Sequence, residues 1–177
     1  MRNRLVFALI FLMATVAAAE PAAKIHPKAH ASILNADGER IGDATFEQAS
    51  GGVKVSLKVS RLPPGAHAFH IHAVGSCDPP DFKSSGGHFN PTHRKHGREN
   101  TEGPHAGDLP DLQIGPDGTG KAEAFVPGIT LSGIGEESLF HPGGTAVVIH
   151  ASADDNKTDP SGNSGARIAC GVIKADL

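Results

Sequence analysis

The stretch Val53-Lys54-Val55-Ser56-Leu57-Lys58-Val59-Ser60 decides the fold class, because apolar and polar residues alternate along it without a break. Successive side chains of a β-strand point to opposite faces, so its apolar residues share one face and its lysines and serines share the other. This pattern predicts an antiparallel strand with one buried and one solvated face.

Short segments of the same kind occur along the rest of the chain, from His30 onward, with clusters of Gly, Pro, Asn and Asp between them. We expect strands over residues 40–48, 67–72, 120–126, 145–150 and 167–173. No segment has a sustained helical period with caps. The sequence therefore predicts an all-β sandwich or barrel.

Two segments, 73–107 and 151–165, do not fit the strand pattern. Both are long, rich in Gly, Pro and polar residues, and without apolar periodicity. Loops of this length inside a compact domain usually carry function, and most of the histidines lie in or beside them.

The amino terminus has the order of a secretory signal: Arg2 and Arg4, an apolar run over 5–16, then three alanines. The run is too short to cross a bilayer, and a buried core helix is the alternative. We expect a cleaved signal over 1–19, a mobile leader over 20–29 and one domain over 30–177. The leader ends beside His30, and we expect His26 within it to be solvated. The protein would then be exported, either to the periplasm or out of the cell. Because no cysteine lies near the expected cleavage site, we do not expect a lipid-linked membrane anchor.

Composition points to metal chemistry. The chain has 177 residues, enough for one domain, with 11 His against two Met and two Cys. Its net charge is -3, and loss of Arg2 and Arg4 leaves 14 basic residues against 19 acidic ones, or -5. This balance argues against nucleic acid as a partner, because nucleic acid binds basic faces.

The pair His70 and His72 is two residues apart on an expected strand, so both rings leave the same face. Phe69 and Ile71 point the other way, into the core. The imidazoles are therefore expected on the outside of the sheet, beneath a covering loop.

A second group follows in the first long loop. His88, His96, His105 and Asp108 together form a closed four-coordinate set of the kind that holds structural Zn²⁺. His150 adds an imidazole beside the second long loop. Because sites made of imidazoles alone suit Cu²⁺, the histidines can serve two different metals.

Export would place Cys77 and Cys170 in an oxidising compartment, where two cysteines can form one disulfide. Two buried free thiols are the alternative.

Two longer motifs make a family resemblance specific. Residues 65–72 with Gly75, and residues 162–173, resemble the two signatures of copper–zinc superoxide dismutases, and residues 87–91, 94–97 and 105–109 resemble the zinc loop of that family. The likeness extends from about residue 31 to 173, and the short cysteine loop and short second loop resemble the bacterial exported branch. It implies an eight-stranded antiparallel Greek-key barrel with two long functional loops.

Transferred residue by residue, the resemblance implies one copper and one zinc per chain. The implied copper ligands are His70, His72, His88 and His150. The implied zinc ligands are His88, His96, His105 and Asp108. Asp154 matches a carboxylate outside both metal shells that links His70 to His96, and Cys77 and Cys170 match the family's intrachain disulfide.

The implied reaction is disproportionation of superoxide to O2 and H2O2 at a copper centre that an imidazolate bridges to a structural zinc. His88 would be the bridge and a proton carrier, and Arg167 would receive the anion. Because the mature chain is negative, capture needs a local positive field, to which we expect Lys157 to contribute beside Arg167.

The alternative function is that of a non-catalytic copper-delivery or metal-binding relative. A zinc hydrolase is disfavoured, because it needs an open coordination position. His67 lies in the signature without matching a ligand, so we expect a hydrogen-bonded framework residue, whereas His93 and His141 are expected to be solvated. Monomer and homodimer both remain open.

Overall fold

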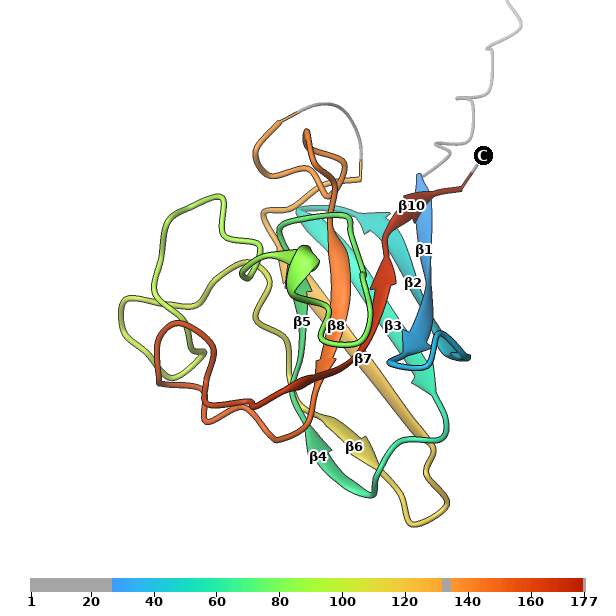
Figure 1. The fold of residues 1–177 in the computed structure, drawn as a ribbon. Helices are drawn as coiled ribbons and strands as arrows, with labels where there is room; N and C mark the ends of the chain where they lie inside the picture. The colour runs from blue at the N-terminus through green and yellow to red at the C-terminus, as the bar shows by residue number, and fades with distance from the viewer. Residues whose placement is uncertain (1–26, 132–134, 177) are drawn as a thin grey trace, which may run out of the picture.

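The computed structural model describes residues 27–131 and 135–176, which form a β-barrel with long loops on one side (Figure 1). Their only helical element is a single 3-10 turn, η1 (Lys83–Ser85). No helix in this part of the chain has the length and apolar character needed to span a bilayer. The strands are β1 (Lys28–Asn35), β2 (Arg40–Ala49), β3 (Gly52–Val59), β4 (Gly65–His67), β5 (Phe69–His72), β6 (Leu112–Ile114), β7 (Gly120–Pro127), β8 (Ala146–His150), β9 (Arg167–Val172) and β10 (Lys174–Ala175).

All strand pairings are antiparallel, in the order β4-β6-β7-β3-β2-β1-β9-β8-β5, with β10 paired to β1. The two ends of this order, β4 and β5, are separated only by Ala68, so the sheet closes on itself through one stretch of chain. If β4 and β5 are counted together and the two-residue β10 is set aside, the barrel has the eight strands that were expected. The pairings of β3 with β7 and of β1 with β9 join strands far apart in sequence, as in a Greek key.

The alternating stretch that predicted the fold is β3, and its period is confirmed. Val53, Val55, Leu57 and Val59 lie in the main apolar core, whereas Lys54 and Lys58 are exposed. The lysines therefore keep the outer face of β3 in solvent while the core face packs inside the barrel.

The amino-terminal boundary of the domain differs from the expectation. The leader was expected to extend through residue 29, but β1 already begins at Lys28, because Ala29 is buried in the core and Lys28 forms an ion pair of 2.6 Å with Glu47. His30 lies in the same strand and contacts Asp176 at 2.6 Å. The expected signal over 1–19, and the rest of the leader with His26, lie outside the described residues.

Both long loops lie on the side of the barrel that carries β5 and β8 (Figure 1). The first loop runs along β5, where Ile71 N–H donates to Gly107 O at 3.0 Å and Phe89 N–H donates to Ile71 O at 2.8 Å. The second reaches the start of β5, since Ala68 N–H donates to Ser152 O at 2.8 Å. The face of β5 that carries the paired histidines is therefore covered, as expected.

Candidate metal centre

The paired histidines of β5 have the orientation expected from their spacing. Phe69 and Ile71 belong to the core, and His70 and His72 point to the opposite face. Both imidazoles are nevertheless almost fully buried, at 0% and 1% exposure, because the loops cover them.

Four buried ring nitrogens converge in front of β5 and β8. Among the described residues, five histidines have a buried ring nitrogen without a hydrogen-bond partner, and four of these form one group within 4.8 Å. The unpartnered atoms of the group are His70 Nδ1, His72 Nε2, His88 Nε2 and His150 Nε2. Burying unpaired polar atoms is costly, so an arrangement of this kind indicates a site for a cation.

The opposite nitrogens of three rings in this first cluster are held by the protein. His70 Nε2 lies 2.7 Å from Asp154 Oδ2, and His72 Nδ1 lies 2.9 Å from Gly86 O. His150 Nδ1 lies 3.3 Å from Gly165 O. Because carbonyl and carboxylate oxygens only accept, these nitrogens carry the ring protons, and the converging nitrogens present lone pairs.

A second cluster, made by the first long loop, adjoins the first. It consists of His88, His96, His105 and Asp108, whose ligand atoms also lie within 4.8 Å of one another. Asp108 Oδ1 lies 2.8 Å from His88 Nδ1, 3.0 Å from His96 Nδ1 and 3.4 Å from His105 Nδ1. A tetrahedral zinc with bonds of about 2.0 Å separates its ligand atoms by about 3.3 Å, so this donor set fits zinc.

His88 belongs to both clusters. Its Nδ1 faces Asp108 in the second, and its Nε2 is one of the unpartnered nitrogens of the first. One imidazole therefore offers a separate nitrogen to each of two adjacent sites.

Asp154 links the clusters through their outer nitrogens. Its Oδ2 contacts His70 Nε2 at 2.7 Å, and its Oδ1 contacts His96 Nε2 at 3.0 Å. The backbone of Asp154 is held by Asp111, whose Oδ1 accepts from Asp154 N–H at 3.0 Å. Asp111 could not be identified from the sequence, because an acidic residue before a three-residue strand gives no signal of its own.

The environment keeps three imidazoles of the first cluster neutral. Burial lowers the pKa of His72 to about 2, of His150 to about 3 and of His88 to about 4, and the neighbouring imidazoles add to the effect. Neutral rings are the form that binds metal, so these three rings are ready to bind across the physiological pH range.

In and around the second cluster, hydrogen bonds determine which side chains are charged. Burial disfavours the charged forms, but hydrogen bonds from the histidines hold the pKa values of Asp108 and Asp154 well below their ordinary range. The same bonds outweigh burial at His96 and raise its pKa to about 9. Both carboxylates are therefore ionised, and Asp108 can act as an anionic ligand.

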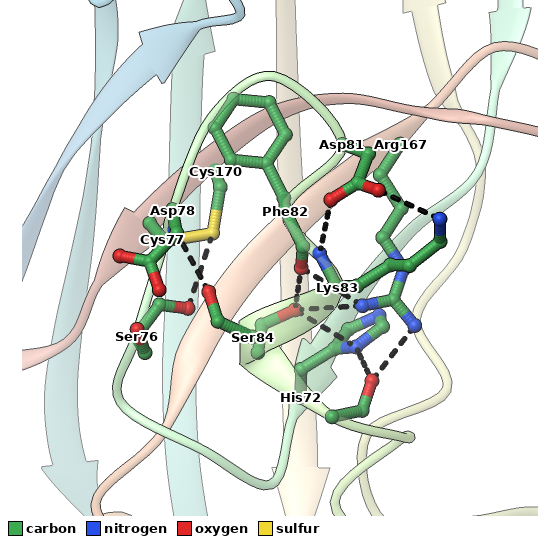
Figure 2. The surroundings of a disulfide bond; sticks show 12 residues. His72, Ser76, Cys77, Asp78, Asp81, Phe82, Lys83, Ser84, Arg167 and Cys170 are labelled. Carbon is green, nitrogen blue, oxygen red and sulfur yellow. Dashed lines mark hydrogen bonds and ion pairs between the residues drawn. A yellow bond between two sulfur atoms is a disulfide. The ribbon is translucent and has the colours of Figure 1, made fainter.

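Arg167, at the start of β9, is fixed against the first long loop (Figure 2). Its guanidinium donates to Phe82 O at 2.9 Å, to Ser85 Oγ at 3.0 Å and to Gly86 O at 2.8 Å. Gly86 O also accepts from His72, so the arginine and a ring of the first cluster share one carbonyl. A disulfide between Cys77 and Cys170 joins the same loop to the same strand, as expected.

Three other residues can be compared with their expectations. His67 is a framework residue: it is buried, and its ring nitrogens lie 2.8 Å from His150 O and 2.9 Å from Pro63 O. Lys157 forms an ion pair of 2.9 Å with Glu99 in which both side chains are exposed, and its steering role stays a prediction. His141 is only partly solvated, because its ring stacks on Phe89 with centroids 5.5 Å apart.

Comparison with known proteins agrees with this geometry. The pattern described as copper/zinc superoxide dismutase matches residues 40–173. The chain is 53% identical over 148 residues to superoxide dismutase [Cu-Zn] 1 of Aquifex aeolicus, covering 83% of this chain and 88% of that protein. A solved structure of a SOD-like protein from Bacillus subtilis is similar to it, with a TM-score of 0.77 and 40% identity, covering 81% of this chain and 96% of that one. The structure of the Cu/Zn superoxide dismutase from Brucella abortus is also similar, with a TM-score of 0.66 and 28% identity, covering 83% of this chain and 99% of that one. With a sequence match over most of its length and a barrel that carries two joined histidine clusters, the chain belongs to the copper/zinc superoxide dismutase family.

Proposed function

We propose that this protein disproportionates superoxide, with copper in the first cluster and zinc in the second. The copper ligands are His70, His72, His88 and His150, and the zinc ligands are His88, His96, His105 and Asp108. The observation that carries this assignment is the set of four buried, unpartnered nitrogens that shares His88 with a closed carboxylate-containing set. When bound, copper supplies the one-electron redox chemistry that the reaction needs, and zinc supplies none.

The protein contributes proton handling through His88. Peroxide formation consumes two protons. His88 Nε2 would carry one of them whenever it is not bound to copper, while Nδ1 stays in the zinc cluster beside Asp108, and the other would come from solvent. Burial lowers the pKa of the doubly protonated ring to about 4, so His88 does not carry two protons at neutral pH, and the one it holds lies on Nε2 when Nδ1 is a zinc ligand.

The protein also contributes anion binding through Arg167. Three hydrogen bonds hold its guanidinium in place, and its charge assists burial in lowering the pKa values of His72 and His150. A guanidinium has five N–H donors, so donors remain for superoxide. A fixed cation beside the copper cluster gives a net negative protein a local field that attracts the anion.

Export is supported by two observations. Residues 1–19 have the charged, apolar and small-residue order of a secretory signal, and the disulfide between Cys77 and Cys170 suits an oxidising compartment. We therefore place the mature protein in the periplasm or outside the cell. Both clusters are complete within one chain, so the chemistry does not require a homodimer.

Metal analysis together with turnover tests the assignment. We expect one copper and one zinc per chain in the dialysed protein, together with superoxide removal. His105→Ala should lose zinc and keep copper, and His150→Ala should weaken copper binding and abolish turnover. His93→Ala is the matched control, because His93 is exposed and belongs to neither cluster.

Two results would contradict the proposal. If His105→Ala still contains one zinc per chain, the zinc ligands are misassigned. If the fully loaded protein removes no superoxide, the protein is a metal-binding relative without catalysis.

A further inference from the structure

We propose that Asp159, in the second long loop, positions the zinc-binding residues His96 and His105. Its carboxylate accepts a hydrogen bond from Nε2–H of His105 once Nδ1 of that ring holds zinc. This inference rests on the zinc site proposed above. It gives the zinc site a second supporting carboxylate, beside Asp154.

Asp159 lies close to both His96 and His105. Its Oδ1 accepts the backbone N–H of His96 at 2.7 Å, and the same oxygen lies 3.9 Å from His105 Nε2. Asp159 thereby links the second long loop to two zinc ligands on the first.

His105 has only one place for its proton when zinc is bound. Its Nδ1 faces the zinc cluster, at 3.4 Å from both Asp108 Oδ1 and His88 Nδ1. A metal at Nδ1 requires a lone pair there, so the proton of the neutral ring is on Nε2. That N–H points away from the cluster and needs an acceptor.

The other zinc rings already have a partner for their outer nitrogen. His96 Nε2 contacts Asp154 at 3.0 Å, and His88 Nε2 belongs to the copper cluster. Of the three zinc-binding rings, only His105 still needs a partner for its outer nitrogen, Nε2. Asp159 is the one carboxylate within 4.0 Å of its Nε2 in the part of the chain that the structure describes.

The two side chains differ in their freedom to move. The His105 side chain is held in place at 8% exposure, whereas the Asp159 side chain is 50% exposed. A small turn of the Asp159 carboxylate that keeps its hydrogen bond to His96 N–H would shorten the 3.9 Å contact when zinc fixes the ring. Because water competes at a half-exposed carboxylate, we expect an effect near the lower end of the 10- to 100-fold range typical of such supporting groups, about 10-fold.

The experiment compares Asp159→Ala, Asp159→Asn and Asp155→Asn in the full metal-loaded protein. Asparagine keeps an oxygen for the His96 N–H but removes the negative charge that faces His105. Asp155 is the matched control, because it lies on the same loop and binds Lys157 N–H, Thr158 N–H and Asn163 but no zinc ligand.

Two readouts separate positioning of His105 from simple attachment of the loop: the rate of zinc release to a chelator, and the visible absorption spectrum with Co²⁺ in the zinc site. We expect both Asp159 variants to release zinc faster, by about 10-fold for alanine, and to shift the Co²⁺ bands. Asp155→Asn should match the unaltered protein in both.

The inference is overturned if Asp159→Asn matches the unaltered protein in release rate and spectrum, since Asp159 would then only attach the loop. It is also overturned if neither Asp159 variant differs from Asp155→Asn. Failure of the zinc site itself looks different: the unaltered protein would bind no zinc, or His105→Ala would retain it.

Discussion

Arg167 and Lys157 show at the scale of single residues that two cations near one site can have opposite roles. Arg167 is held by a hydroxyl and two carbonyl oxygens, which are neutral and leave its positive charge in place. Lys157 lies against the carboxylate of Glu99, which cancels most of its charge. Only the arginine gives a lasting local field.

Substituting these cations one at a time tests that distinction. We expect Arg167→Gln to lower the turnover of superoxide by about 10-fold and to flatten its dependence on ionic strength, because the field that salt screens over about 10 Å has been removed. Lys157→Gln, the matched control, should leave both nearly unchanged. Stopped-flow measurements of superoxide turnover from low to high salt test this prediction. Equal effects of the two substitutions would refute the role of Arg167.

His67 is a structural residue whose loss should affect stability. Replacing it with Phe removes the ring nitrogens that contact His150 O at 2.8 Å and Pro63 O at 2.9 Å. A buried group left unpaired costs about 1–3 kcal/mol, and of the two contacts only the one with His150 is buried. We therefore expect a loss of about 1–3 kcal/mol in the free energy of unfolding, measured with urea on metal-free protein.

His93→Asn is the control for that measurement. His93 is exposed and has a positive φ of 52°, a conformation that asparagine tolerates. We expect a change within about 0.5 kcal/mol, as for most surface substitutions. A comparable loss in both variants would mean that His67 is not a framework residue.

At the scale of elements, local sequence predicts the long strands and fails at the short ones. β3 is recognisable because each of its apolar residues contributes to one core face. β6 has only three residues, and a period of two cannot be recognised over Leu112–Ile114. The start of β1 was missed because Lys28 gains its order from Glu47 on the neighbouring strand.

The candidate site was predictable to the extent that its motifs are local. The histidines of both clusters lie in recognisable segments, and the two clusters that they form in space agree with the sets that the resemblance implied. The supporting contacts of Asp111, Ser85 and Asp159 were not predictable, because their partners are distant in sequence and meet only after the loops fold over β5.

The disulfide connects Arg167, the proposed anion-binding residue, to its supports. Cys170 lies on the strand that begins with Arg167, and Cys77 lies on the loop that provides Phe82 O and Gly86 O. We expect the double substitution Cys77→Ser/Cys170→Ser to destabilise the protein by at most about 4–5 kcal/mol and to lower turnover at full copper loading. Denaturant unfolding and superoxide assays measure the two effects, and unchanged turnover would show that the loop holds Arg167 without the bridge.

At the scale of the whole molecule, the histidine clusters make metal-free stability depend on pH. His72, His88 and His150 have lower pKa values in the folded protein than the ordinary value of 6.5, so the unfolded chain binds more protons as the pH falls. Each ring then destabilises the fold by up to about 1.4 kcal/mol per pH unit below 6.5.

We therefore expect the unfolding free energy of the metal-free protein to fall between pH 6.5 and pH 4.5, as measured with urea. His96 has little effect on this fall, because well below pH 6.5 it is protonated in both states. Its stabilising contribution declines between about pH 6.5 and pH 9, as the pH rises through its raised pKa. His72→Asn should make the fall less steep. A constant unfolding free energy over this range would contradict the shifted pKa values.

The backbone of the first long loop also protects an edge of the sheet. On the side of β5 away from β8, Gly107 and Phe89 satisfy the N–H and C=O of Ile71, and residues 88 and 108 form isolated bridges with the same strand. An uncovered strand edge is a template on which a second polypeptide can add. Loss of the ions that hold this loop would thus remove a cap as well as a catalyst, and a preparation depleted of metal should self-associate at concentrations where the loaded protein stays dispersed.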